Sequence, residues 1–269
     1  MGKVITVYAP KGGVAKTTTV LGVASCLARL GYRVLIVDTD PQANATAGIC
    51  DKDPDTEIDK TIKDLLQKDV IKLIKSGKPP MGLYDEVIYD STDTHLQIMT
   101  SCPALSVTEE DISARWSRSN ELKWALSPIK DDYDFTLIDT KPSIGWLPFN
   151  ALCAAEEAIV PAYDPYSVSA VQQMIETVLQ LKQELDADVK ISGILSTRYN
   201  RSTTLSKAVR DELIKQYGTG VFRTIIYQDI KLSKCAIQHQ SIFSYDPNSS
   251  GATSYKAFTK ELLTGWGMI

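Results

Sequence analysis

The chain has 269 residues, of which 43% are hydrophobic and 23% charged, and its formal net charge is −4. These proportions are ordinary for a globular protein and exclude a disordered or fibrous chain. The slightly acidic balance excludes a global basic field, so a nucleic-acid partner would have to meet a local patch of positive charge.

Short apolar or β-branched runs predict strands along most of the chain. The runs are near-continuous rather than alternating, which is typical of strands buried on both faces. Helical periods lie between them, and we therefore expect an α/β fold with a doubly wound, mostly parallel sheet flanked by helices. The predicted strands are residues 4–8, 33–37, 96–99, 135–138, 158–162 and 191–195. The clearest helical period consists of Val168, Val171, Ile175, Val178, Leu179 and Leu185.

The chain shows no internal repeat, low-complexity tract or Gly/Ser linker that would divide it. A single domain over residues 1–269 is the prediction. Residues 51–91 differ in character, because they are polar, contain Lys78-Pro-Pro80 and carry two short helical patterns. We expect this segment to be a surface excursion between two strands.

A glycine loop follows the first predicted strand and precedes an apolar helix, which is the context of a phosphate-binding P-loop. Glycines let backbone N–H groups approach phosphate oxygens, and the helix N-terminus adds the positive end of its dipole. A lysine in the loop would meet the β- and γ-phosphates, and the next hydroxyl would bind Mg²⁺. The predicted nucleotide contacts here are Lys11, Gly12, Gly13, Val14, Ala15, Lys16, Thr17 and Thr18.

Carboxylates end two of the predicted strands. Asp38 and Asp40 follow the strand at 33–37, and Asp139 ends the strand at 135–138. Ligands of a doubly wound sheet bind at the carboxyl ends of its strands, so these carboxylates should point toward the phosphates. Asp139 has the position of a Walker B aspartate, which contacts Mg²⁺. These patterns predict Thr17 and Asp139 as metal-site residues.

The loop departs from the GxxxxGK[ST] pattern, since Pro10 and Ala15 stand where that pattern has glycine. It resembles the deviant form KGGxxK[ST] of the ParA/MinD/Soj ATPases. Residues 38–44 resemble the DxDPQxN motif of that family, residues 230–236 its VRLSEA block and residues 250–255 its PGAxAY block. Residues 139–145 resemble DxPPSxG, except that Lys141 replaces a proline. The resemblance runs from about residue 3 to 263.

The resemblance implies roles for individual residues. Lys11 would reach across a nucleotide-sandwich dimer to the phosphates of the partner, and Asp40 would orient the attacking water. With Lys16 these form the predicted catalytic set. Asp38 would help to hold the Mg²⁺ shell, and Asn200 lies in the loop that would meet the adenine base. Ala15 fits the loop without strain only if its φ angle is negative. Lys141 is either solvated, close to the nucleotide or at the dimer seam.

The leading hypothesis is a partition ATPase without an N-terminal helix-turn-helix domain. It would dimerise on Mg-ATP, bind DNA non-specifically and work with a ParB-like adaptor on plasmid or chromosome DNA. The odd number of scattered cysteines suggests reduced thiols and hence a cytoplasmic protein. The resemblance implies that it is associated with the nucleoid. One alternative is a relative that positions a protein cargo such as carboxysomes or chemoreceptor arrays.

Two further readings are weaker. A MinD-like membrane ATPase is less expected, because residues 260–269 are short and interrupted by glycine rather than a basic amphipathic helix. A metabolic P-loop ligase or kinase with a small-molecule acceptor is the remaining class. Partition predicts a basic surface, and residues 198–234 carry eight basic and three acidic side chains. A solvated helix face is the simpler explanation of this excess. The candidate DNA contacts are Lys207, Arg210, Arg223, Lys231 and Lys234.

Overall fold

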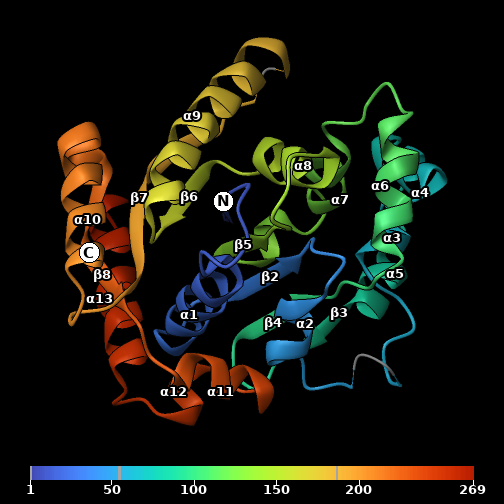
Figure 1. Cartoon of the computed structure of the whole chain (residues 1–269). Helices are drawn as coiled ribbons and strands as arrows, with labels where there is room; N and C mark the ends of the chain where they lie inside the picture. Colours follow the sequence, from blue (N-terminus) through green and yellow to red (C-terminus); the bar gives the residue numbers. More distant parts are fainter. Residues whose placement is uncertain (1, 54–55, 186) are drawn as a thin grey trace.

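One sheet of eight strands, in the order β3-β4-β2-β5-β1-β6-β7-β8, organises the part of the chain that is described (Figure 1). The computed structural model describes residues 2–53, 56–185 and 187–269. β3 pairs with β4 in the antiparallel direction, and the other neighbours are parallel. The strands are β1 (Lys3–Val7), β2 (Val34–Asp38), β3 (Ile88–Asp90), β4 (Leu96–Met99), β5 (Phe135–Asp139), β6 (Glu157–Ala162), β7 (Lys190–Tyr199) and β8 (Val221–Tyr227).

Burial on both faces explains the near-continuous apolar runs. In β2, Leu35 and Val37 pack into one core cluster, whereas Val34 and Ile36 pack into a second cluster across the sheet. Each of these four side chains is fully buried. All six predicted runs form strands. The two strands that were not predicted, β3 and β8, lie at the edges of the sheet.

Helices cover both faces of the sheet, giving the predicted doubly wound α/β domain. One face carries α1 (Lys16–Arg29), α2 (Asn44–Ile49), α11 (Lys231–Ile237), α12 (Ile242–Tyr245) and α13 (Ser250–Gly265). The other carries α3 (Ile62–Leu65), α4 (Lys68–Lys75), α5 (Met81–Val87), α6 (Leu105–Ser113), α7 (Glu121–Leu126), α8 (Trp146–Ala154), α9 (Pro165–Leu185) and α10 (Thr204–Tyr217). Short 3-10 turns occupy Lys130–Asp132 and Gly218–Gly220. No helix within the described residues has the length and apolar character needed to span a membrane.

The apolar stripe of α9 differs in one position from its predicted pattern. Val171 and Val178 are buried as expected, together with Met174 and Leu181. Leu179 is 52% exposed. One residue advances a helix by about 100°, so the position after Val178 turns away from the stripe that faces the sheet.

Residues 51–91 contribute more to the interior than a surface excursion would. Ile62, Leu65 and Ile71 are buried in the core cluster on the α9 face, and the hydroxyl of Tyr84 donates to the Ala125 carbonyl oxygen at 2.7 Å. Most apolar positions of the two short helical patterns therefore face the core, whereas Leu73 is 46% exposed. Residues 54 and 55 of this segment lie outside the described part.

Three neighbouring parallel strands end at the same edge. In the register of the sheet, Asp139 of β5 lies beside Val7 of β1 on one side and beside Asp38 of β2 on the other. The glycine loop continues from β1 at this edge. The sheet therefore brings the loop and the strand-end carboxylates together, although Asp38 lies 25 residues and Asp139 lies 126 residues beyond Gly13 in the sequence.

Candidate functional site

The glycine loop between β1 and α1 presents its backbone to the outside. Gly12 and Gly13 are exposed, and Gly13 has a φ of 74°. Val14 differs, because its side chain is buried and its carbonyl oxygen accepts a hydrogen bond from the Thr197 hydroxyl at 3.0 Å. Only the backbone N–H of Val14 can therefore serve the predicted nucleotide contact.

Ala15 adopts the left-handed conformation, with φ 66° and ψ 36°. An L-residue with a Cβ is strained in this region by about 1 kcal/mol or more. Ala15 therefore does not have the negative φ angle at which alanine would fit the loop without strain. The loop keeps its course despite this cost, since α1 begins at the next residue and the Thr19 N–H donates to the Ala15 carbonyl oxygen at 3.0 Å.

Lys16 is the buried cation of the site. Its side chain curls back over the loop, where Nζ donates to the Lys11 carbonyl oxygen at 2.9 Å, and the residue is 6% exposed. Burial lowers the pKa of Lys16, and the nearby charges of Asp139 and Asp40 oppose that shift. The carboxylates therefore help to keep this lysine positive where phosphate charge would arrive.

Thr17 and Asp139 form a pair suited to Mg²⁺. The Thr17 hydroxyl donates to Asp139 Oδ2 at 2.7 Å. The other oxygen of Asp139 is buried and has no hydrogen-bond partner among the described residues. Burial, followed by the charge of Asp38, raises the pKa of Asp139 well above its ordinary value. A divalent cation would relieve both the orphaned oxygen and the mutual repulsion of the carboxylates. When bound, Mg²⁺ would neutralise charge on the β- and γ-phosphates.

Asp38 lies deeper than Asp40. Its carboxylate accepts from the Asp40 N–H at 3.0 Å and from both the N–H and the hydroxyl of Thr46 at 2.8 Å. Burial raises the pKa of Asp38 to about 6, even though these hydrogen bonds lower it. Asp38 thus holds the start of α2, and any contact with the metal would be made through water.

Asp40 lines the cavity beside the loop. Its Oδ1 accepts the Gln42 N–H at 2.9 Å, and its backbone carbonyl oxygen accepts the Ser101 hydroxyl at 2.8 Å. The first bond fixes the side chain and the second fixes the backbone, so Asp40 is held in the cavity wall two residues after the end of β2. A carboxylate in this position can accept a proton from water or orient it.

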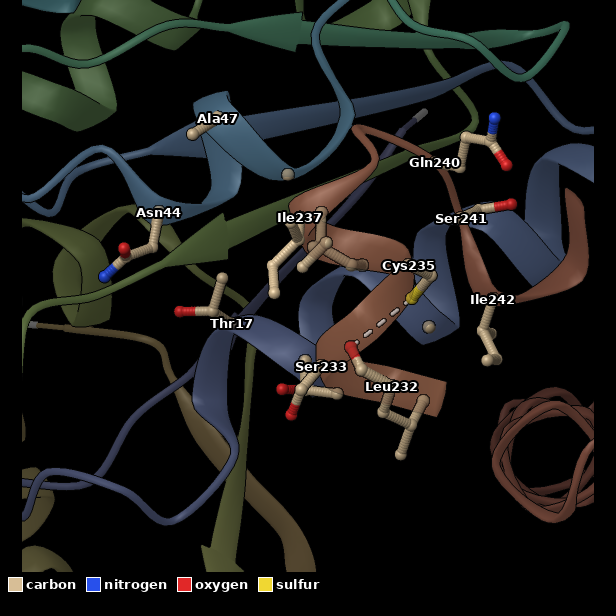
Figure 2. Close-up of a pocket in the computed structure, with 15 residues that line it drawn as sticks. Thr17, Asn44, Ala47, Leu232, Ser233, Cys235, Ile237, Gln240, Ser241 and Ile242 are labelled. Atoms are coloured by element: carbon tan, nitrogen blue, oxygen red, sulfur yellow. Dashed lines mark hydrogen bonds between the residues drawn. The ribbon is translucent and has the colours of Figure 1, made fainter. Parts of the chain in front are cut away.

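The cavity has a volume of about 520 Å³. The loop residues Gly12, Gly13, Ala15, Lys16, Thr17 and Thr18 form one wall, and residues 226–233, from β8 into α11, form the opposite wall. A second cavity of about 480 Å³ shares Thr17, Thr18 and Asn44 and lies between α1, α2, α11 and α12. Figure 2 shows Leu232, Ser233 and Cys235 of α11 along this second cavity. Helix α11 therefore borders both spaces.

The base contact at Asn200 stays a prediction, since Asn200 does not line the cavity beside the glycine loop. Asn200 lies in a separate, neighbouring cavity with Tyr199, Arg201 and Tyr227, because its amide oxygen accepts the Ser202 N–H in a turn at 2.9 Å. Arg198 lines the nucleotide-side cavity instead. Arg198 was missed, as were residues 227–230, which follow the unpredicted strand β8. The β-branched run at 221–227 was the signal available in the sequence.

Lys11 does not line the cavity next to its own loop. Its Nζ forms an ion pair with Asp164 Oδ2 at 2.5 Å and lies 5.1 Å from the ring centroid of Tyr166 and 5.6 Å from that of Tyr163. Asp164 is itself fixed by the hydroxyl of Ser167, which donates to Oδ1 at 2.6 Å. The side chain of Lys11 is therefore held at the start of α9, apart from that of Lys16.

Comparison with known proteins agrees with this geometry. A family model described as an AAA domain matches residues 2–191. The sporulation initiation inhibitor protein Soj of Bacillus subtilis is 34% identical over 265 residues, covering 97% of this chain and 98% of Soj. The chromosome partitioning protein ParA of Myxococcus xanthus is 32% identical and covers 98% of this chain and 88% of its own length. The chain belongs to the ParA/MinD family of Walker-type ATPases. As a member of this family it uses ATP and Mg²⁺.

A solved structure of similar architecture supports the fold of this ATPase. It is the cobyrinic acid a,c-diamide synthase of Mycobacterium smegmatis with bound ADP and magnesium, 29% identical, with a TM-score of 0.81 over 99% of this chain and 96% of that one. The likeness spans both edges of the sheet. It therefore includes the β8 and α11 wall as well as the phosphate loop.

The candidate DNA contacts of the ATPase fall into two groups. Lys207, Arg223 and Lys234 are exposed. Arg210 instead donates to the Ser196 hydroxyl at 2.9 Å and to the Phe222 and Arg223 carbonyl oxygens at 3.2 and 3.0 Å. Lys231 forms an ion pair with Asp246 at 2.5 Å, which raises its pKa. Arg210 thus anchors α10 to β8, and a phosphate would have to compete with Asp246 for Lys231.

Proposed function

We propose that this ATPase is a partition ATPase that forms a nucleotide-sandwich dimer on Mg-ATP, binds DNA without sequence preference in the nucleoid and acts with a ParB-like adaptor. The observation that carries the proposal is the similarity to B. subtilis Soj and M. xanthus ParA over nearly the whole chain. Exposed basic side chains near β8, at the edge of the sheet, form the surface that would contact DNA.

The residues of the glycine loop and the strand-end carboxylates would share the work of the proposed ATPase cycle. The N–H groups of the glycine loop and Lys16 would hold the β- and γ-phosphates. Thr17 would hold Mg²⁺ directly, with Asp139 behind it. Asp40, at the mouth of β2, would orient the attacking water. Without an adaptor we expect slow turnover, so that the ATP state persists long enough to bind DNA.

The DNA step would depend on dimerisation. Lys207 on α10 and Arg223 on β8 are exposed, and Lys234 is exposed on α11, whose Leu232 and Ser233 line the cavity. Two copies of this surface in an ATP dimer would contact several phosphates at once. Each neutralised phosphate releases counterion, so the affinity should fall with salt at a log-log slope of about 0.9 per contact.

Duplex binding by the full chain tests the proposal. A random-sequence duplex should bind in ATP with Mg²⁺ and fail to bind in ADP. Lys207→Glu combined with Arg223→Glu should reduce binding by at least about tenfold and lower the salt slope by about 2. Nucleotide binding should stay unchanged. The matched control is Lys68→Glu with Lys78→Glu, the same charge change at exposed positions in and just after α4, which lies on the opposite side of Figure 1 from α10 and β8. Equal loss in both double variants, or a parent that never binds duplex with ATP, would overturn the proposal.

A ligase is the second candidate, because the M. smegmatis structure carries the name of a diamide synthase. A ligase would couple ATP hydrolysis to a stoichiometric amide product, whereas a partition ATPase releases only ADP and phosphate. Assay of ammonia or glutamine consumption during ATP turnover separates the two. A protein cargo in place of DNA would appear as an ATP dimer that ignores duplex and binds an adaptor alone.

A further inference from the structure

Lys141, which stands where the family has a proline, makes its principal contact far from the phosphates. Its Nζ forms an ion pair with Glu109 Oε2 of α6. The Lys141 side chain is 20% exposed and that of Glu109 is 14% exposed. A pair this enclosed is not a solvated surface pair, and removing one member leaves the other charge poorly hydrated. Lys141 is therefore not freely solvated, and it does not line the cavity beside the glycine loop. A position at the dimer seam stays a prediction.

The carboxylate of Glu109 also contacts the far end of the loop formed by residues 141–147. Glu109 Oε1 accepts the N–H of Leu147, in the first turn of α8, at 3.1 Å. An acceptor at this position satisfies one of the free N–H groups of a helix N-terminus and favours a negative charge. A Cβ on Gly145 would lie 2.6 Å from Glu109 Oε1. A side chain at 145 would therefore have to displace the Glu109 carboxylate, and residues 141 to 147 are tied at both ends to one side chain.

The tied loop forms part of the nucleotide cavity. Pro142 lines the cavity, and its Cβ lies 3.7 Å from where a Cβ on Gly12 would be. Thr140, just before the loop, is fixed to β1 because its hydroxyl donates to the Val7 carbonyl oxygen at 2.9 Å. Pro142 thus sits between the Mg²⁺-side strand end at Asp139 and the glycine loop, at the phosphate end of the cavity.

We propose that Glu109 and Lys141 are a positioning pair for ATP hydrolysis, which holds Pro142 against the glycine loop and so fixes the wall of the site at the phosphates. Neither side chain lines the cavity beside the glycine loop. The pair acts through the backbone of residues 141–147. Its loss therefore affects the catalytic step, where the phosphate end must be closed and ordered, more than the initial binding of ATP.

A double-mutant cycle measures this coupling in the full chain. Glu109→Gln keeps an acceptor for Leu147 and removes only the charge, and Lys141→Met keeps the length of the side chain. Each single variant should lower kcat of phosphate release by at least about fivefold with KM changed less than about twofold. The double variant should be no slower than the slower single variant. Lys141→Arg should retain kcat within about twofold, because the ion pair can re-form.

A second ion pair supplies the control. Lys130 and Glu156 are joined at 2.7 Å, with side chains 28% and 42% exposed, and they lie outside the cavity lining. Lys130→Met and Glu156→Gln should leave kcat unchanged. Additive losses in the Glu109 and Lys141 cycle, an unchanged kcat, or a loss in Lys141→Arg equal to that in Lys141→Met would overturn the proposal. So would losses that track the unfolding temperature, since the pair would then be only structural.

Discussion

Arg198 donates a hydrogen bond from Nη1 to the carbonyl oxygen of Gly13 at 2.9 Å. Its guanidinium also lies 4.9 Å from the ring centroid of Tyr163, so the end of β7 is tied to the phosphate loop. We expect Arg198→Met to lower ATP affinity about tenfold, because a charged hydrogen bond of roughly 1.5 kcal/mol that orders the loop is lost. Titration with a fluorescent ATP analogue measures this.

Arg201 is the control for the Arg198 prediction. It is exposed and stacks 3.9 Å from the ring centroid of Tyr227, in the neighbouring cavity with Asn200. Arg201→Met removes the same charge without touching the glycine loop, and ATP affinity should change less than about twofold. Equal effects in the two variants would mean that general charge, rather than the Gly13 contact, supports binding.

Ala15→Gly should stabilise the protein. The left-handed φ of 66° at this position costs an alanine about 1 to 2 kcal/mol, whereas glycine adopts it freely. The larger entropy of glycine in the unfolded chain offsets part of this, so we expect a net gain of about 0.5 to 1 kcal/mol in the free energy of unfolding. Urea unfolding without nucleotide measures the change.

Two other alanines serve as comparisons for the Ala15→Gly prediction. Ala43 is also left-handed, with φ 52°, so Ala43→Gly should stabilise to a similar extent. Ala47 lies within α2, where Ala47→Gly should destabilise by about 1 kcal/mol. The same sign at all three positions would show that backbone strain does not control the effect.

Local signals in the sequence predicted the centre of the fold and the residues of the phosphate loop. A buried parallel strand needs apolar side chains on both faces, and this requirement shows as a continuous run in each of the six predicted strands. Lys16, Thr17, Asp38 and Asp139 could be placed because each adjoins such a strand or the helix after it. The sheet register then brings Asp38 beside Asp139.

Contacts between distant segments were not predictable in the same way. Lys141 could not be paired with Glu109, because thirty-two positions separate them and only the packing of α6 against α8 joins them. Asn200 and Arg198 are two residues apart, and the turn after β7 decides which one faces the cavity. The left-handed angle at Ala15 is likewise set by the geometry of the loop, which overrides the preference of alanine.

The buried carboxylate of Asp38 should make the nucleotide-free protein less stable as the pH rises. Burial raises the pKa of Asp38 to about 6 in the folded state, compared with about 3.9 in an unfolded chain. The folded state therefore binds more protons between these values, and stability falls as the pH rises through about 6. From about pH 5 to 7.5 the loss from this group is on the order of 1 kcal/mol.

Asp38→Asn removes the titration of Asp38 and, with it, the charge that helps to raise the pKa of Asp139, so both effects reduce the pH dependence. The amide does not titrate, so its urea unfolding curve should lose less stability over the same pH range by about 1 kcal/mol. Asn can still accept from Thr46 through its carbonyl oxygen, which keeps α2 in place. Identical pH slopes in the parent and the variant would show that Asp38 does not carry this destabilisation.

Asp40→Ala should slow hydrolysis without weakening ATP binding. Asp40 is 5% exposed and its carboxylate lines the cavity, so its loss removes the group proposed to orient water. We expect kcat to fall at least about a hundredfold and ATP affinity to change less than about threefold, leaving the ATP form populated. Ser101→Ala, which removes only the hydrogen bond to the Asp40 backbone, should keep kcat within about threefold. A turnover in Asp40→Ala equal to that of the parent would remove this role.

Lys11→Met should leave ATP binding intact and prevent the ATP dimer. Lys11 does not line its own cavity and is held by Asp164, so its charge is available only to phosphates that approach from a partner. Without it, two nucleotides facing each other across the interface would repel. Light scattering with a non-hydrolysed ATP analogue should report a monomer for Lys11→Met, while Lys3→Met, which breaks another lysine ion pair at 2.6 Å, should still dimerise.

Asp164→Asn releases Lys11 from its ion pair and should shift the monomer-dimer midpoint to a protein concentration about threefold lower, since a partly enclosed pair contributes on the order of 1 kcal/mol. A stable dimer of Lys11→Met would end the trans-lysine interpretation.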